Sequence, residues 1–273
     1  MGDICLKTGR NKMLFFLYHD VIFDNSTSGF QANSASKYKI PEQTFKEHLE
    51  AISESNYSFW EGNSNQEGNS ICLTFDDGGI SNLKTASLLE KYHARGIFFI
   101  VTDLINKDGF LSSEQILNLH KRGHWIGSHS QSHPDRMAFV SESKLFLEWN
   151  NSKKDLENII KSPIKICSVP GGSISKNVIN EADKAGYSLL FNSMPSKESQ
   201  TTLIENKNGI KSIGRISITS SWSGKKLKDF LKNTYIQIQI MKFIYFLKQK
   251  LVHQNRFFSW LYNYIRRFKK DLY

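Results

Sequence analysis

The feature that most constrains the fold is a regular alternation of short apolar runs with amphipathic segments. The apolar runs, rich in β-branched and aromatic residues, predict buried strands that begin at Phe15, Ile71, Ile97, Trp125, Ile164, Tyr187 and Ile210. Apolar residues at helical spacing predict helices over 41–55, 82–96, 112–124, 141–161 and 175–186. Such alternation indicates parallel βαβ units. With no internal repeat and no proline-rich linker, one α/β barrel accounts for most of the 273 residues.

The strand Ile71–Phe75 ends in two adjacent carboxylates, Asp76 and Asp77, followed by Gly78 and Gly79. Glycines allow a tight exit with positive φ. The aspartates would then lie at the carboxyl end of a strand, where α/β proteins place their sites. Like charges side by side repel unless a cation, a proton or hydrogen bonds compensate them. Two interpretations remain open here: a turn whose carboxylates accept local N–H groups, or a functional site.

A second strand runs into two histidines, His129 and His133, in the segment GSHSQSHP. Neutral imidazole is a good ligand for Zn²⁺ and related ions, although such a pair can also be an exposed turn. Two histidines and one carboxylate form a three-ligand set that leaves a position open for water. One aspartate could then bind the cation while the other accepts a proton from the attacking water.

The TFDDG segment followed by HSQSHP resembles the polysaccharide deacetylases, the NodB-homology domain, over about residues 13–218. The resemblance implies an irregular (β/α)₇ barrel and metal-dependent removal of acetyl groups, usually from N-acetylated sugars. By position, the resemblance implies that Asp76 is the general base and that Asp77, His129 and His133 bind the metal, with Zn²⁺ as the expected ion. It also implies that the backbone N–H of Gly171 stabilises the oxyanion and that Pro170 contacts the substrate.

The sequence departs from the family pattern at three motifs. The arginine that usually braces the catalytic aspartate is replaced by Ser168, and the Asp/Trp motif is not found around 189–196. The late L-x-H motif is missing, because no histidine lies between His133 and His253. A Leu-Tyr-His tripeptide instead ends at His19, which is similar to the biofilm-type exopolysaccharide deacetylases. We therefore predict that His19 is the general acid; the alternative is a structural histidine under a strand end.

Arg215, in the segment IGRISI, has no fixed role from sequence alone. It could brace an acid on a neighbouring strand or contact substrate, or it could be a solvated surface arginine. Tryptophans could stack on sugar rings, although core packing is the usual outcome; they are Trp60, Trp125 and Trp222. The remaining histidines fall on predicted helices or their ends and are expected to be surface or packing residues: His48, His93, His120, His124 and His253.

The net charge of +10 is concentrated at the end of the chain. Residues 224–273 contain 12 Lys/Arg and 2 Asp/Glu, so the rest carries 24 of each sign. General nucleic-acid binding is therefore not predicted. We divide the chain into a barrel, 13–223, and a basic amphipathic helical tail, 224–273. Residues 240–270 either contact an anionic membrane surface or pack on the barrel as a helix pair.

The N-terminal segment offers no recognised export signal, because the apolar run Met13–Tyr18 leads directly into His19 and Asp20. We therefore expect a cytoplasmic location, with peripheral contact to the inner face of the membrane as an option. The expected activity is deacetylation of a sugar in a cell-surface polysaccharide, an exopolysaccharide or a lipid-linked precursor. The expected partner is an acetylated oligo- or polysaccharide, with no obligate protein partner. The alternative is a non-catalytic glycan-binding barrel at the membrane surface.

Overall fold

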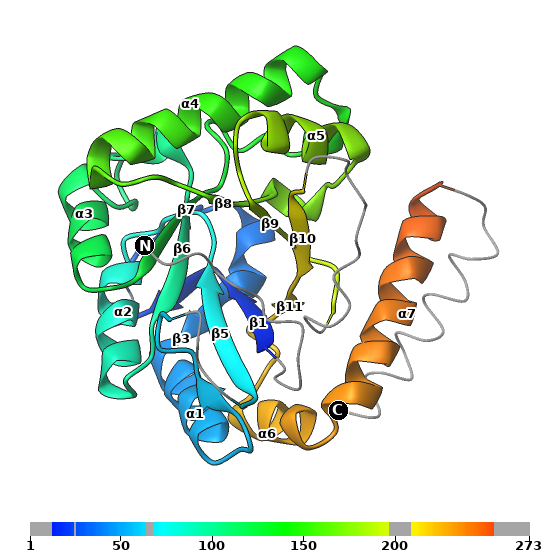
Figure 1. Cartoon of the computed structure of the whole chain (residues 1–273). Coiled ribbons are helices and arrows are strands. Elements are labelled where there is room, and N and C mark those ends of the chain that lie inside the picture. The colour runs from blue at the N-terminus through cyan, green and yellow to red at the C-terminus, as the bar shows by residue number, and fades with distance from the viewer. Residues whose placement is uncertain (1–12, 25, 64–67, 197–208, 254–273) are drawn as a thin grey trace.

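Parallel strands curve into a nearly closed barrel with helices around its outer face (Figure 1). The computed structural model describes residues 13–24, 26–63, 68–196 and 209–253. Within these residues the strand order is β10-β9-β8-β7-β6-β5-β1-β11, and every neighbouring pair is parallel. The alternation of strand and helix in the sequence predicted this arrangement, and the α/β barrel class is confirmed.

Among the described residues, the barrel has seven strand positions when β10 and β11 are taken as one strand interrupted at Arg215. The barrel strands are β1 Met13–Tyr18, β5 Ser70–Phe75, β6 Gly96–Ile100, β7 Trp125–Ser128, β8 Ile166–Ser168, β9 Leu189–Asn192, β10 Lys211–Gly214 and β11 Ile216–Ser217. Three short strands are additional: β2 Asp20–Ile22, β3 Lys39–Pro41 and β4 Ser58–Phe59.

The helices begin and end close to the positions that the sequence predicts. They are α1 Glu42–Ser53, α2 Asn82–Lys91, α3 Ser113–Lys121, α4 Glu142–Ile160, α5 Lys176–Lys184, α6 Gly224–Lys232 and α7 Thr234–His253. The start of α3 shows why a helix boundary can be predicted from the sequence. The Ser112 side chain accepts the N–H of Gln115, and the Gln115 side chain accepts the N–H of Ser112, which satisfies two donors at the helix start.

Apolar side chains fill both the inside of the barrel and the layer between strands and helices. The inner cluster includes Phe15, Phe99 and Phe191, whose rings meet with centroids 5.2 Å apart in the pairs Phe15–Phe191 and Phe99–Phe191. The larger outer cluster joins the opposite face of the strands to the helices. Alternate residues of each strand therefore point inward and outward, as expected in a packed barrel.

Two breaks in strands place polar residues at the barrel's carboxyl end. The first strand, predicted as one segment, is split at His19: β1 ends at Tyr18, and β2 leaves the barrel to pair with β3. The last strand is split at Arg215, where β10 pairs with β9 and β11 pairs with β1. The barrel is therefore closed by the segment around Arg215, which joins β9 on one side to β1 on the other. Arg215 is only 1% exposed.

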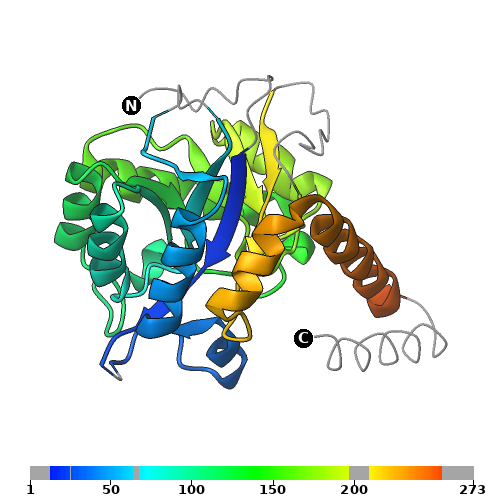
Figure 2. The same ribbon diagram turned by 90° about the horizontal axis from the view of Figure 1, so that it is seen from below.

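The division predicted at Gly224 differs from the structure. Helix α6 packs against α1 and buries Leu227, Phe230 and Leu231, so it belongs to the barrel body. Only α7 extends away from the barrel, as both views show (Figures 1 and 2). Residues 254–273 of the predicted tail lie outside the described residues. None of the described helices combines the length and the apolar character that crossing a membrane requires.

Candidate active site

Asp76, at the end of β5, is held by the arginine that closes the barrel. The Arg215 guanidinium donates through Nη1 to Asp76 Oδ1 and through Nη2 to Asp76 Oδ2, both at 2.7 Å. Its remaining donors bond Ser168 Oγ, Thr74 Oγ1 and the carbonyl of Asn192. These bonds occupy the five N–H groups of the guanidinium. Arg215 is therefore a buried anchor for Asp76, not a solvated surface residue.

The floor beneath this ion pair is aromatic. The Arg215 guanidinium carbon lies 5.4 Å from the ring centroid of Phe99 and 6.0 Å from that of Phe191. The quadrupole of an aromatic ring in this position attracts the guanidinium cation. The two rings also exclude water from this side of the ion pair. Ser168 Oγ adds a 3.2 Å hydrogen bond to Asp76 Oδ2. Asp76 is consequently fixed by bonds from two strand positions that are distant in sequence.

Asp77 faces the opposite way, because the backbone turns sharply at this point. Asp77 has φ +75° and Gly78 has φ +76°, conformations that cost a non-glycine residue free energy. Gly79 is needed for a different reason, since a Cβ there would collide with the Asp20 carboxylate. Asp77 Oδ1 is buried and has no hydrogen-bond partner among the described residues. An orphaned carboxylate oxygen of this kind indicates a missing cationic partner.

The two histidines are placed by a loop built from side-chain hydrogen bonds. Glu148 on α4 accepts the N–H groups of Gln131 and Ser132 at 3.0 and 2.9 Å. The N–H of His133 bonds Ser130 Oγ, and His133 has φ +57°. The rings of His129 and His133 come to 5.1 Å between centroids. The loop thus brings residues four apart onto one side, as the sequence predicts.

The ligating atoms of Asp77, His129 and His133 fit a small divalent cation. All three atoms lie within 4.8 Å of one another. Asp77 Oδ1 is 3.4 Å from His129 Nε2 and 3.5 Å from His133 Nε2. A tetrahedral Zn²⁺ site with bonds of about 2.0–2.1 Å would have ligand atoms roughly 3.4 Å apart. His129 Nδ1 donates to the Ser168 carbonyl, which leaves Nε2 as the ligating nitrogen.

The electrostatics of the cluster also call for a cation. Burial opposes ionisation of Asp76, but Arg215 and then His129 outweigh it and hold the pKa of Asp76 below its usual range. Burial opposes a charge on His129 as well, yet Asp76 and Asp77 together raise the pKa of His129. Burial and the neighbouring His129 lower the pKa of His133. Arg215 already pairs with Asp76, so a cation held at Asp77 would compensate the carboxylate that Arg215 does not bond.

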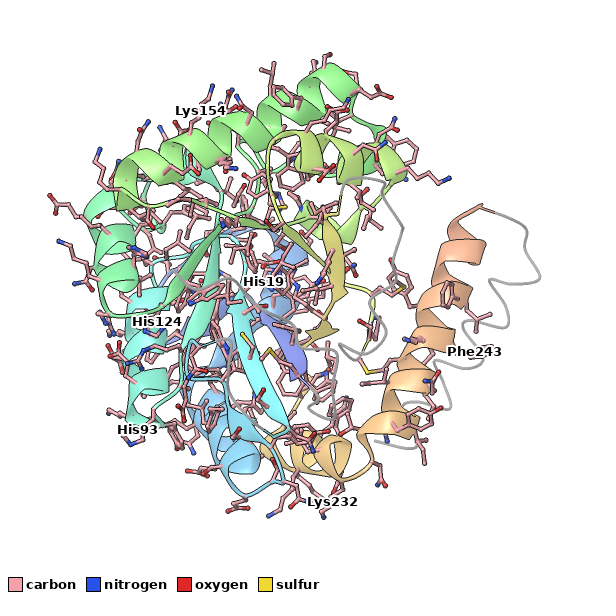
Figure 3. All side chains as sticks on the ribbon, in the orientation of Figure 1. His19, His93, His124, Lys154, Lys232 and Phe243 are labelled. Atoms are coloured by element: carbon pink, nitrogen blue, oxygen red, sulfur yellow. The ribbon has the colours of Figure 1, made fainter. Side chains whose placement is uncertain are left out.

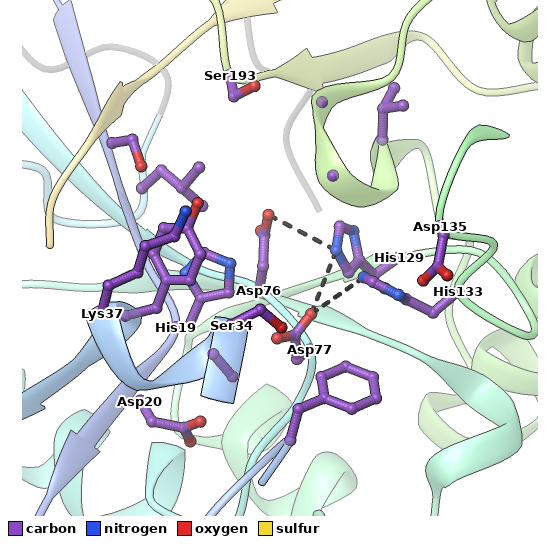
Figure 4. Close-up of a pocket in the computed structure, with 18 of the residues that line it drawn as sticks. His19, Asp20, Ser34, Lys37, Asp76, Asp77, His129, His133, Asp135 and Ser193 are labelled. Carbon is purple, nitrogen blue, oxygen red and sulfur yellow. Dashed lines mark ion pairs between the residues drawn. The ribbon is translucent and has the colours of Figure 1, made fainter. Parts of the chain in front are cut away.

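His19 lies across the two aspartates from the histidine pair (Figure 4). Its ring stacks on Tyr38, with centroids 4.3 Å apart. Both line a cavity of about 340 Å³ that also contains Asp76, Asp77 and His129. His19 is not part of the cluster of ligating atoms found among the described residues. Figure 3 places His19 inside the barrel and His124 near its outer edge.

Two predicted substrate contacts are not supported by the geometry. Gly171, with φ +57°, lines the cavity together with Val169 and Gly172, but Pro170 is buried and is not among the described lining residues. Arg215 borders the cavity, yet its donors are already engaged. The structure therefore makes Arg215 a positioning residue and gives Pro170 a packing role. The three tryptophans discussed above also lie outside the described lining.

Sequence reasoning missed most of the cavity's outer wall. The segment between β2 and β3, which includes a 3₁₀ turn at Asn33–Tyr38, contributes Phe30, Lys37 and Tyr38. Asp20, buried and bonded by Ser28 and Ser81 hydroxyls, ties this segment to the turn after Asp77. Burial raises the pKa of Asp20. A loop rich in Asn and Ser carries no periodic signal, so only the break at His19 could have indicated its position.

The described residues thus combine a parallel α/β barrel, an Asp-His-His cluster that could hold a metal ion, and a second aspartate braced by an arginine. A sequence model of the polysaccharide deacetylases matches residues 63–190. The Bacillus subtilis protein YxkH, named as a polysaccharide deacetylase, is 20% identical over 81% of this chain and 77% of its own length. Residues 63–190 therefore resemble the polysaccharide deacetylases, and the similar proteins found carry that name.

Further relatives support the same assignment. A peptidoglycan-N-acetylglucosamine deacetylase of Bacillus cereus is 31% identical over 50% of this chain and 61% of its own length. The crystal structure of a polysaccharide deacetylase from Bacillus cereus superposes with a TM-score of 0.66 at 18% identity, covering 81% of this chain and 69% of that one. The solved structure shares the fold, which agrees with the barrel described above.

Proposed function

We propose that this protein is a metal-dependent hydrolase that removes acetyl groups, bound as N-acetyl, from a sugar of a cell-surface polysaccharide, an exopolysaccharide or a lipid-linked precursor. The observation that carries the proposal is the contrast between adjacent carboxylates. Asp76 is saturated by Arg215 and Ser168, whereas Asp77 presents an unpartnered oxygen to two imidazoles. The N-acetyl preference rests on the Bacillus cereus relative, which is named for that substrate.

Asp77, His129 and His133 would hold the metal, with Zn²⁺ favoured by two nitrogen ligands and one oxygen ligand. When bound, the ion would polarise the acetyl carbonyl and make the attacking water more acidic. Ser168 supports this set by accepting the Nδ1 proton of His129, which fixes the tautomer. The carbonyl and the hydroxyl of Ser168 therefore serve different residues, His129 and Asp76.

Asp76 would accept the proton of the attacking water. Arg215 keeps this carboxylate ionised, so that it can accept a proton, although the lowered pKa also makes it a weaker base. The two bonds from Arg215 also prevent Asp76 from turning towards the histidines and competing with Asp77. Because Arg215 is bonded to Asp76 and not to Asp77, Asp76 would act as the base and Asp77 would bind the metal.

His19 would donate a proton to the leaving amine from the other side of the cavity. Its Nδ1 is buried without a partner among the described residues, so proton transfer runs through Nε2. The stacked Tyr38 ring limits rotation of the imidazole. Gly171 lines the cavity, and its N–H would donate to the oxygen of the acetyl carbonyl as charge develops there.

The case for a non-catalytic glycan-binding barrel rests on the missing arginine of the third motif and on the missing Asp/Trp motif. Arg215 donates to Asp76 from the last barrel strand and also bonds Ser168, so a guanidinium is present at this aspartate. The first of the two reasons is therefore weakened, and the second remains. Tyr38 and Phe30 provide apolar faces at the mouth of the cavity, where a sugar ring could lie.

The test is acetate release from a panel of N-acetylated and O-acetylated oligosaccharides, with metal-stripped and Zn²⁺-reloaded protein. The proposal predicts release from N-acetyl substrates, loss on stripping and recovery on reloading. Binding of these glycans without acetate release, in protein that retains metal, would support the glycan-binding alternative. Equal rates with and without metal would contradict the proposed site.

A further inference from the structure

Helix α7 leaves the barrel with its apolar side chains uncovered. Thr234 and Ile238 are buried near α6, but the helix then runs free of the barrel (Figure 2). Five of the eight exposed large hydrophobic residues in the described chain lie on α7: Tyr235, Ile236, Ile240, Phe243 and Phe246. An exposed cluster of this kind on a monomer marks an interaction surface. Among the described residues, these side chains of α7 are therefore not covered by the barrel.

The exposed residues form a face and not a scatter. Ile236, Ile240 and Phe243 follow the spacing i, i+4, i+7, which places them on one side of a helix with 3.6 residues per turn. Ile238, buried towards the body, points to the opposite side. Phe243 and Ile236 are each 59% exposed, and Ile240 is 42% exposed. These three side chains are therefore open to solvent.

The positive charge of α7 and of the sequence around it indicates what kind of surface the exposed face binds. The sequence of α7 contains Lys242, Lys248 and Lys250 and no acidic residue. From Gly224 to the end of the sequence, 12 basic residues stand against 2 acidic ones, while the rest of the chain is balanced. A basic helix with aromatic and aliphatic residues on one face is typical of elements that lie in the interface of an anionic bilayer.

We infer that α7 docks on an anionic lipid surface, with Ile236, Ile240 and Phe243 inserted among the lipids and the basic charge of this part of the sequence attracting it to the headgroups. This inference does not depend on the proposed catalytic function. It gives the barrel a position at a membrane, where a lipid-linked glycan would be within reach. Because α7 is joined to the barrel through α6, docking leaves the barrel strands undisturbed.

The experiment is co-sedimentation of the full chain with phosphatidylcholine vesicles, with and without phosphatidylglycerol. Wild-type protein should bind the anionic vesicles far more tightly, and added salt should release it. The triple variant Ile236→Ser/Ile240→Ser/Phe243→Ser should lower the vesicle partition coefficient by at least about 100-fold, since three large apolar side chains are lost from the bilayer. These side chains are exposed, so the melting temperature should not fall.

The matched control is Phe139→Ser/Leu147→Ser, which removes exposed apolar side chains from the barrel body, 70% and 50% exposed. This variant should bind anionic vesicles as the wild type does. The inference is overturned if the triple variant also binds like the wild type, or if neutral and anionic vesicles bind equally. A dimer in solution that the triple variant dissociates, without vesicle binding by either protein, would assign the face to a second copy of the chain instead.

Discussion

Strand β7 carries a histidine at each end, and the two have opposite surroundings. His124, just before the strand, accepts the Gly96 N–H on Nδ1 at 3.1 Å and bonds Glu90 through Nε2 at 3.0 Å. His129, just after it, is anchored only through Nδ1, and its Nε2 faces the carboxylates of Asp76 and Asp77. Both side chains are almost completely buried. A buried histidine with both nitrogens bonded is expected to be structural, whereas one with an open nitrogen beside carboxylates is a candidate metal ligand.

The same contrast separates the two ends of the barrel. At the amino end, burial lowers the pKa of His124 to about 4, despite Glu90, so the ring is neutral. At the carboxyl end, the carboxylates overcome burial and raise the pKa of His129. Buried carboxylates and a histidine whose pKa they raise therefore lie together at the carboxyl end, where α/β barrels place their sites.

The largest expected effect is a difference in bound metal between variants of His129 and His124. His129→Ala should reduce bound Zn²⁺ and acetate release to background, because one of three ligands is lost. His124→Asn should keep both, since an asparagine oxygen can still accept the Gly96 N–H. Elemental analysis and an acetate assay on the same preparations provide the measurement. Full metal occupancy in His129→Ala would show that the comparison is mistaken.

The second prediction concerns His19, on the far side of the cavity. Amide cleavage expels a poor leaving group, so losing the acid should slow N-acetyl removal by about 10²- to 10⁴-fold. His19→Ala should slow hydrolysis of an activated aryl acetate much less, because its phenolate leaves without a proton. Metal content should be unchanged. Equal losses on both substrates would exclude His19 as the acid, and reduced metal content would make it a ligand.

The third prediction tests Arg215 as a positioning residue. Arg215→Lys keeps a cation but loses the paired bonds to Asp76, and we expect turnover to fall about 10- to 100-fold. The pKa of Asp76 should rise without the guanidinium, so the acid limb of the pH profile should move to higher pH. A purely structural arginine would change stability and leave the profile in place. Partial recovery in Arg215→Ser/Ser168→Arg would show that the guanidinium matters more than its strand of origin.

The smallest effect is on stability and concerns His124. Its pKa falls from an ordinary 6.5 to about 4 on folding, so between these values the unfolded chain binds more protons. The stabilisation is complete above pH 6.5 and is lost as pH falls towards 4. Between pH 7 and pH 5 this group should contribute a loss of about 2 kcal/mol. Urea unfolding at both pH values should show a smaller loss for His124→Asn than for the wild type.

The sequence predicted the strands, the helices and the Asp-His-His cluster because these signals are local. Apolar periodicity marked the strands, and the carboxyl ends of parallel strands must lie at one end of the barrel. From the sequence, an ion pair between Arg215 and Asp76 was only one of several possible roles for Arg215. The two residues are 139 positions apart, and no local pattern connects them. No spacing rule predicts that a serine at 168 makes room for this guanidinium. The loop around Tyr38 lacked any periodic pattern, so its place over the cavity required the structure.

The exposed face of α7 shows a different limit. Helical spacing predicted the amphipathic segment, but it could not decide whether the apolar face packs on the barrel or remains open. That decision depends on the short α6 connection and on which surface of the barrel α1 already covers. Helix α6, which follows the boundary predicted at Gly224, is also amphipathic, and it buries Leu227, Phe230 and Leu231.

The most direct test of the central claim, that the adjacent aspartates have separate roles, is Asp76→Asn measured for metal and acetate in one preparation. The account predicts full Zn²⁺ stoichiometry, because Asp77 and the two histidines remain. It also predicts a fall in N-acetyl turnover of about 10²- to 10⁴-fold, because an amide cannot accept the proton of water. Near-normal acetate release would contradict the base assignment, and loss of metal from this variant would place Asp76 among the ligands.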